Sequence, residues 1–210
     1  MRPGSRTLGI AFSDAETTSY AAGAVVRTDG TLDGLAYATC TVGGTDATDA
    51  LAGLFDRLGR EDVRRVLCSG VAPAWFNLID LPRLSAAVDR PVCAVSYEAS
   101  PGLEPALRDA FDGDALDRRL ATYQSLPPRR RVDTDRSAAG NEHAADESAQ
   151  AADESARPTF VRSVGIGETR AATVVRDLTR DGFRRPEPVR IASVAAGAHR
   201  AAVERDAEFP

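Results

Sequence analysis

The sequence contains no lysine, and all 26 of its basic residues are arginine. Chemistry that requires a primary amine is therefore excluded: a P-loop phosphate lysine, a Schiff base with a carbonyl substrate, and a Ser-Lys nucleophile pair. Histidine is almost as scarce, with 2 residues in 210. That scarcity excludes a histidine-rich metal site and a mechanism that uses several histidines.

The sequence also has few cysteines and no long apolar run. Cys40, Cys68 and Cys93 are an odd number without the spacing of a metal site, and each lies in an apolar run. This pattern predicts reduced, buried thiols in a cytoplasmic protein. No stretch has the length and apolar character of a membrane span, and the first residues lack the profile of a signal peptide. We therefore expect no membrane partner.

Negative charge is concentrated in one segment. Residues 133–157 hold seven acids and two arginines, which equals the whole net charge of −5. Almost nothing apolar in this segment is larger than alanine, so it lacks the surface to offset the entropy cost of ordering. We predict a disordered acidic insert over residues 132–157, interrupting one folded domain made of residues 6–131 and 158–205. A solvated linker is favoured over an acidic mimic of nucleic acid.

Hydrophobic periodicity on either side of the insert predicts strands alternating with helices. Residues 7–12, 20–28 and 31–42 have the composition of strands, and Asp29-Gly30 between the last two is a strong hairpin signal. The period then changes to that of a helix beginning near Thr45 or Asp46. Further strands are predicted at 63–68, 91–97 and 159–164, and further helices at 81–88, 103–111, 116–123, 168–178 and 189–204. This order predicts an α/β protein with a ribonuclease H-like mixed sheet and helices on both faces.

Polar residues in the loops after the predicted strands are candidates for a site at the carboxyl edge of the sheet. Asp46 is interpreted either as the cap of the helix that follows it or as a ligand of a divalent metal. Asp14, just after the first strand, is either a solvated turn acid or a second metal ligand. Trp75 is either a packing aromatic or a platform for a nucleobase, and Asp80 is expected to cap the next helix. Ser69 is not in a nucleophile elbow, which disfavours a serine hydrolase.

Four segments carry a resemblance to a known family. They are Gly43-Gly44-Thr45-Asp46-Ala47-Thr48-Asp49-Ala50, Phe76-Asn77-Leu78-Ile79-Asp80-Leu81, Thr159-Phe160-Val161-Arg162-Ser163-Val164-Gly165 and Arg185-Pro186-Glu187-Pro188-Val189-Arg190-Ile191-Ala192. These segments are similar to an archaeal family named endonuclease dU, which itself resembles endonuclease V. The resemblance covers nearly the whole chain outside the acidic insert. The absence of lysine together with that insert suggests a halophilic member.

The resemblance implies a metal-dependent endonuclease of DNA repair, acting on deaminated, deoxyuridine-containing DNA with Mg²⁺ or Mn²⁺. In endonuclease V the metal is held by acids on the first strand, before the first helix and at the end of the fourth strand. Asp46 falls at the second of these places. Asp14 lies three residues beyond the first-strand position and is the other available acid. We assign Asp14 and Asp46 as catalytic residues and metal ligands, and Trp75, Asn77 and Asp80 as substrate-binding residues.

Two positions depart from the family pattern. Many relatives have Gly-Ile-Asp-Asp-Gly on the first strand, where this chain has Gly9-Ile10-Ala11-Phe12-Ser13. Many have Leu-Asp-Gly on the fourth strand, where this chain has Cys68-Ser69-Gly70. Ala11 and Ser69 thus replace expected acids, and Ile166 stands where endonuclease V has a histidine. The alternative prediction is a non-catalytic nucleic-acid-binding or regulatory member that has lost its metal site.

Overall fold

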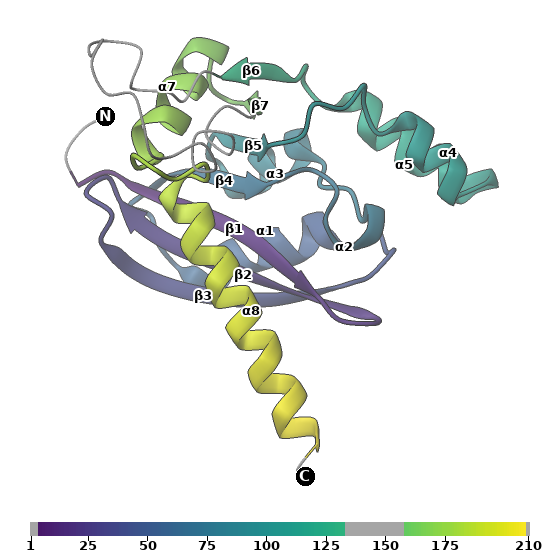
Figure 1. The fold of residues 1–210 in the computed structure, drawn as a ribbon, viewed down its shortest axis with the longest axis horizontal. Helices are drawn as coiled ribbons and strands as arrows, with labels where there is room; N and C mark the ends of the chain where they lie inside the picture. Colours follow the sequence, from purple (N-terminus) through teal and green to yellow (C-terminus); the bar gives the residue numbers. More distant parts are fainter. Residues whose placement is uncertain (1–3, 133–157, 209–210) are drawn as a thin grey trace, which may run out of the picture.

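Seven strands form one mixed sheet in the computed structural model, which describes residues 4–132 and 158–208 (Figure 1). Their order across the sheet is β3-β2-β1-β4-β5-β7-β6. The strands span Arg6–Asp14 (β1), Thr18–Arg27 (β2), Leu32–Thr41 (β3), Val63–Ser69 (β4), Val92–Ser96 (β5), Arg130–Val132 (β6) and Thr159–Val164 (β7). The first three pair antiparallel, as the Asp29-Gly30 signal predicts, whereas β1, β4 and β5 run parallel.

Helices cover both faces of the sheet. They span Ala47–Leu58 (α1), Pro73–Phe76 (α2), Leu81–Val88 (α3), Glu104–Ala110 (α4), Gly113–Ser125 (α5), Glu168–Leu178 (α7) and Glu187–Glu208 (α8). Leu51 and Leu54 of α1 and Leu84 of α3 share one core with the apolar side chains of β1. In Figure 1, α8 crosses β1 and β2 on the side of the sheet opposite α1. This arrangement confirms the predicted mixed sheet with helices on both faces.

The strand β1 directs alternate side chains to these two faces. Ile10 belongs to the core beneath α1, whereas Ala11 packs with Ala192 of α8. A Cβ atom on Gly9 would lie 2.1 Å from the carbonyl carbon of Pro188, so no other residue fits there without moving α8. The face of β1 that holds Ala11 therefore lies directly beneath α8.

Two elements have no counterpart in the sequence-based prediction. The helix α2 has four residues and β6 has three, and segments this short carry no periodic signal. Val132, which the prediction assigns to the acidic insert, ends β6 and is buried. The rest of the predicted insert, 133–157, lies outside the described residues. No helix in residues 4–132 and 158–208 is long and apolar enough to cross a membrane.

The three cysteines are free and buried, as their apolar surroundings predict. Burial raises the pKa of the Cys68 and Cys93 thiols to about 12. A thiol with so high a pKa is not a nucleophile near neutral pH, because the thiolate is the reactive form. Neither residue is therefore a candidate for covalent catalysis.

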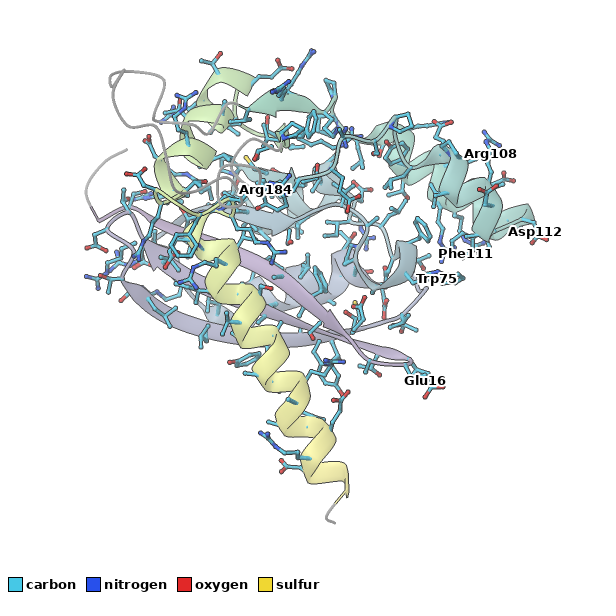
Figure 2. The ribbon with its side chains drawn as sticks, viewed as in Figure 1. Glu16, Trp75, Arg108, Phe111, Asp112 and Arg184 are labelled. Carbon is cyan, nitrogen blue, oxygen red and sulfur yellow. The ribbon has the colours of Figure 1, made fainter. Side chains whose placement is uncertain are left out.

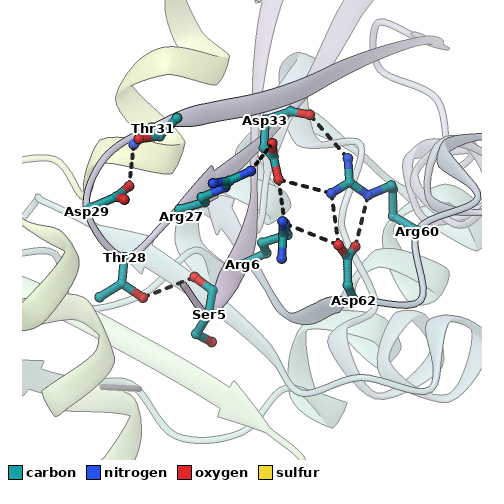
Figure 3. A network of polar contacts seen from close by, with 9 residues as sticks. All are labelled: Ser5, Arg6, Arg27, Thr28, Asp29, Thr31, Asp33, Arg60 and Asp62. Atoms are coloured by element: carbon teal, nitrogen blue, oxygen red, sulfur yellow. Dashed lines mark hydrogen bonds and ion pairs between the residues drawn. The ribbon is translucent and has the colours of Figure 1, made fainter. Parts of the chain in front are cut away.

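A network of ion pairs joins the amino ends of β1 and β4 to the β2–β3 hairpin (Figure 3). Asp33 of β3 is its centre: it accepts hydrogen bonds from Arg6, from Arg27 (2.8 Å) and from Arg60 (3.1 Å). Asp62 pairs in turn with Arg60 (2.9 Å) and Arg6 (3.1 Å). The hydrogen bonds from Arg27, Arg6 and Arg60 hold the pKa of the Asp33 carboxyl well below its usual range.

We expect Asp33→Asn to lower the melting temperature at neutral pH. The difference from wild type should be smaller at acidic pH. A carboxyl group whose pKa is lowered by folding stabilises the folded state above its unfolded pKa, about 4 for aspartate. That stabilisation is lost as the pH falls through the folded pKa, so the difference from wild type should narrow below about pH 4. Thermal unfolding across this pH range measures the effect, with Asp109→Asn on the exposed side of α4 as the control. A difference that stays constant with pH would contradict the assignment.

Candidate active site

Asp46 directly precedes α1 near the carboxyl edge of the sheet, where β1, β4 and β5 end. Its side chain makes no capping hydrogen bond to α1. Instead, Oδ1 accepts a hydrogen bond from the backbone N–H of Thr41 (3.1 Å), and Oδ2 accepts one from the Thr41 hydroxyl (3.0 Å). The interpretation of Asp46 as a side-chain cap is therefore wrong, because the donors at the end of β3 take up its carboxylate.

The side-chain amide of Asn77 completes the surroundings of Asp46. Its Nδ2 donates to Asp46 Oδ1 (2.6 Å) and to the carbonyl oxygen of Thr41 (2.8 Å), while its Oδ1 accepts from the backbone N–H of Ala47 (2.9 Å). Asn77 is fully buried, so it caps α1 in place of Asp46 and holds the carboxylate at the same time. The sequence carries no signal for this cap, because capping motifs are local and Asn77 is 30 residues away from Ala47.

Burial and hydrogen bonding have opposite effects on the pKa of Asp46. Partial burial on its own would raise the pKa of the carboxyl group, but the hydrogen bonds from Asn77 and Thr41 outweigh it and lower the pKa below the ordinary value. Hydrogen bonds to the charged form favour that form. Asp46 is therefore ionised at neutral pH and is held by three donor groups, two from Thr41 and one from Asn77.

Asp14 ends β1 opposite Ser19 of β2, and Ser19 is opposite Cys40 of β3. Directly opposed residues in antiparallel strands have side chains on the same face, and the Ser19 hydroxyl donates to Asp14 Oδ1 (2.5 Å). Burial raises the pKa of the Cys40 thiol to about 11, and the nearby charges of Asp46 and Asp14 add to the increase. The two carboxylates are therefore bound to different strands, Asp14 to Ser19 of β2 and Asp46 to Thr41 of β3, next to Cys40 in the chain.

The family pattern has acids at the positions of Ala11 and Ser69. Both side chains lie on the face of the sheet opposite to that of Asp14, Ser19 and Cys40. Ala11 is 2% exposed and packs with Ala24, Val26 and Ala192 under α8. Ser69 follows Cys68, whose side chain joins the core beneath α1, so alternation directs Ser69 to the face of Ala11. An acid at either position would not lie on the face that holds Asp14.

The donor set is poor for a divalent metal ion. Within residues 4–132 and 158–208, no three side chains of His, Cys, Asp and Glu come together as a metal site. Asp14 ends β1 and Asp46 is bound to Thr41 of β3, so β2 lies between their strands, and each carboxylate is already hydrogen-bonded. Magnesium requires near-octahedral oxygen ligands, and catalytic sites hold it with one or two convergent carboxylates. The side chains present do not fit such a site.

A strained turn presents Trp75 near Asp46. Ala74, Trp75 and Phe76 of α2 have positive φ angles of 49°, 50° and 62°, a conformation that costs a non-glycine residue about 1–3 kcal/mol. Trp75 is nevertheless 56% exposed. Its ring centre lies 5.1 Å from that of Phe111, and Figure 2 shows the two labelled side chains next to each other. The edge of the Trp75 ring lies over Gly43, where a Cβ atom would be 2.8 Å from Cε3.

Arg119 of α5 fastens this turn to the loop that leads to Asp46. Its guanidinium donates to the carbonyl oxygens of Phe76 (3.2 Å), Gly44 (3.1 Å) and Gly43. It also lies 3.8 Å from the centre of the Phe111 ring. Burial lowers the pKa of Arg119, although an arginine remains charged in proteins. The sequence gives no signal for this role, because an arginine within a charged helix has the pattern of a solvent-facing position.

Asp80 caps α3, as predicted, by accepting a hydrogen bond from the N–H of Arg83 (2.9 Å). Its own N–H donates to the Thr48 hydroxyl of α1 (3.0 Å). The segment from Asn77 to Asp80 is therefore attached to α1 at both ends. Asn77 and Asp80 thus shape the surroundings of Asp46, and the roles of Trp75, Asn77 and Asp80 toward a substrate stay predictions.

A cavity of about 300 Å³ opens at the ends of β4 and β5, beside Ser69. Arg162 and Arg129 line it together with Tyr123. Arg162 donates to the Tyr123 hydroxyl (3.1 Å), and Arg129 donates to the carbonyl oxygen of Ser100 (2.9 Å). A concave site with an aromatic ring and a few placed polar groups is typical of a small-ligand pocket.

Comparisons with known proteins agree with this architecture. The sequence model of a family described as endonuclease dU matches residues 3–200. A UPF0215 protein of Pyrobaculum aerophilum is 28% identical over 191 residues, 90% of each chain. The fold is similar to that of a protein of unknown function from Archaeoglobus fulgidus, with a TM-score of 0.70, 24% identity, and coverage of 92% of this chain and 96% of that one. It is also similar to Ciona intestinalis endonuclease V in complex with inosine-containing DNA, with a TM-score of 0.59, 12% identity, and coverage of 95% and 87%. The predicted ribonuclease H-like fold is confirmed.

Proposed function

The chain belongs to the endonuclease dU family, and from this membership we propose that it is an endonuclease that cleaves DNA containing deoxyuridine. The observation that carries the proposal is the family match over residues 3–200, nearly the whole chain. A fold similar to that of endonuclease V supports an action on DNA. Fold alone does not determine function, so the assignment also needs a site.

The site that supports the proposal is the carboxyl edge around Asp46. We assign Asp46 as the principal catalytic carboxylate and Asp14 as the second. Asn77 and Asp80 hold the segment around Asp46 in place, and Trp75 offers its ring to a base of the DNA. The cavity beside Ser69 has the size to receive one nucleobase.

The proposal places the protein in the repair of deaminated DNA in an archaeal cytoplasm. Three free, buried thiols support a reducing compartment. A net charge of −5 without any lysine supports a salt-adapted member of the family.

Family membership suggests a divalent metal, Mg²⁺ or Mn²⁺, and the candidate ligands in this chain are Asp46, at a position of the family pattern, and Asp14, three residues beyond another. In this chain the two carboxylates do not converge, and the face that holds Ala11 and Ser69 lacks the acids of the family pattern. The residues present do not fit the metal, and we derive no catalytic step through it.

A second candidate function follows from that mismatch: binding to DNA without cleavage. The specific observation in its favour is Ala11, buried beneath α8 at the position where relatives hold an acid. Such a member would retain the platform around Trp75 and the Asp46 loop as a recognition surface.

A nicking assay separates the two functions. Duplexes with one deoxyuridine and matched duplexes with thymidine are incubated with the full chain in MgCl₂, MnCl₂ or EDTA. The nuclease proposal expects cleavage of the deoxyuridine strand that Asp46→Ala abolishes. Asp49→Ala is the matched control, because Asp49 is an exposed carboxylate in the first turn of α1. Binding without cleavage in every buffer establishes the second candidate, and the absence of both contradicts the two functions alike.

We expect Trp75→Ala to weaken the binding of deoxyuridine-containing DNA by about tenfold, because stacking on an aromatic ring contributes about 1–3 kcal/mol per base. Trp75→Phe should retain most of the affinity. Phe183→Ala is the control, since Phe183 is an aromatic residue of similar exposure (52%) outside the proposed site. Fluorescence anisotropy with labelled oligonucleotides measures the effect. Equal affinity of the Trp75→Ala and Phe183→Ala variants would remove Trp75 from the site.

A further inference from the structure

A second concave surface lies at the amino edge of the sheet, at the opposite end of the strands from Asp46. It is a groove of about 980 Å³ between the starts of β1 and β4 and the turn from β7 to α7. Its charged lining residues are Arg6, Arg64, Arg65, Arg170 and Asp62. Among the residues that the structure describes, four arginines and one acid line the groove. Asp62 pairs with Arg60 and Arg6, and Arg6 is also bound by Asp33, so the excess positive charge comes from Arg64, Arg65 and Arg170.

This positive charge is a local feature of the groove. The chain as a whole carries a net charge of −5, so four arginines along one groove do not follow from a basic composition. Burial lowers the pKa of Arg65, and the positive charge of Arg170 lowers it further. Two guanidinium groups close enough to repel each other are stabilised when an anion binds near both.

The backbone beside these arginines also favours an anion. Gly167 lines the groove and is the N-cap residue of α7, an eleven-residue helix with no side-chain cap. The first-turn N–H groups of such a helix carry partial positive charge and remain available to an acceptor. Arg170 belongs to the same turn and is exposed. Arginine side chains together with a helix N-terminus are the arrangement that binds phosphate oxygens.

The size of the groove indicates more than one phosphate. Its volume is about three times that of the cavity beside Ser69, far more than a single inorganic phosphate fills. Arg64 and Arg170 are both exposed along it. A chain of phosphate groups, as in a nucleic-acid strand, offers more than one of these arginines an anionic partner at the same time.

We propose that this amino-edge groove binds the phosphate backbone of a nucleic-acid strand, as a contact surface separate from the site around Asp46. The inference rests on the proposed function for the identity of the polyanion, since DNA is what that function supplies. The shared chemistry is a ligand with several phosphate groups, which a small polyphosphate also offers.

Charge-reversal variants of the full chain test the proposal. The double variant Arg64→Glu/Arg170→Glu changes two exposed groove residues. The control Arg57→Glu/Arg205→Glu makes the same change of net charge at exposed positions of α1 and α8. Binding of an uncleavable, deoxyuridine-free duplex is measured by anisotropy over a range of salt concentrations, and binding of pyrophosphate by calorimetry. Circular dichroism and thermal unfolding verify that both variants fold.

We expect the groove variant to bind the duplex at least tenfold more weakly than the control. The slope of log K against log salt should decrease by about 0.9 for each phosphate that the protein no longer neutralises. Loss of pyrophosphate binding with unchanged duplex binding would overturn the nucleic-acid assignment and identify a small polyphosphate. Duplex affinity and salt slope equal to those of the control would overturn the proposal. None of these outcomes depends on cleavage, so a negative nicking assay leaves this test intact.

Discussion

Asn77→Ala is expected to lower the free energy of unfolding by about 3–5 kcal/mol and to abolish cleavage. The substitution removes the three hydrogen bonds that the fully buried Asn77 side chain makes with Asp46, Thr41 and Ala47. Each buried group left without a partner costs about 1–3 kcal/mol. The Asp46 carboxylate also loses the donor that fixes Oδ1, so its position relative to Trp75 and the DNA is no longer determined.

A second variant separates this positioning role from a general loss of packing. Asn77→Asp keeps the shape of the side chain and the acceptor for Ala47, but it places a second carboxylate against Asp46. Two carboxylates at hydrogen-bond distance cannot both be ionised at low cost, so the pair takes up a proton with a raised pKa. A raised folded-state pKa makes the variant least stable at high pH, and stability should return as the pH falls through that pKa.

Chemical denaturation at several pH values measures both variants. Asn77→Asp should approach wild type in acid, whereas Asn77→Ala should not, because alanine offers no group to share the proton. Asp80→Ala is the control: it removes a cap from α3 in the same segment without touching Asp46. Equal pH profiles for the two Asn77 variants would contradict the contact with Asp46.

Much of the fold was predictable because its signals are local. The Asp29-Gly30 pair predicts the β2–β3 hairpin, and proline at the second position of an apolar segment predicts α3, which spans Leu81–Val88 as expected. The elements without a prediction are α2 and β6. Their three or four residues are held by tertiary contacts, such as the pairing of β6 with β7, and no periodic pattern exists over so short a length.

The candidate site was less predictable, since it is held by contacts between distant residues. The loop sequence identifies Asp46, but one of its two interpretations, the side-chain cap, is wrong because Thr41 and Asn77 bind the carboxylate. The positive φ angles of α2 fall on Ala74, Trp75 and Phe76, none of which is a glycine that would signal such a turn. They persist because surrounding contacts, including those of Arg119, outweigh the local preference.

The sequence gives a partial signal for the small residue at position 11, where the family pattern has an acid. Gly9, Ala11 and Ser13 alternate along β1 and share one face. Three small residues in a row on one face indicate that another backbone approaches closely, and α8 does so at Gly9. The missing acid is thus part of how α8 packs on the sheet, in agreement with the burial of Ala192 at the same contact.

Ala11→Asp is therefore expected to destabilise the protein instead of creating a metal site. The carboxylate would be buried among Ala24, Val26 and Ala192 without a partner, and an uncompensated buried charge costs about 3–5 kcal/mol. Ala11→Asn is the matched control, because it adds the same volume without the charge. The gap between the two variants should open as the pH rises above the unfolded pKa of aspartate, about 4, since burial raises the folded-state pKa of an acid.

The effect of Mn²⁺ on the stability of these variants tests the metal site directly. If α8 covers position 11 as the structure shows, MnCl₂ should leave the melting temperature of Ala11→Asp unchanged, alone or combined with Ser69→Asp. A rise that occurs in Ala11→Asp/Ser69→Asp and not in Ala11→Asn/Ser69→Asn would mean that α8 moves and that the two introduced acids hold the ion. Since metal binding stabilises only the state that holds the site, the melting temperature tests whether two acids at positions 11 and 69 are enough to hold the ion or whether the packing of α8 excludes it.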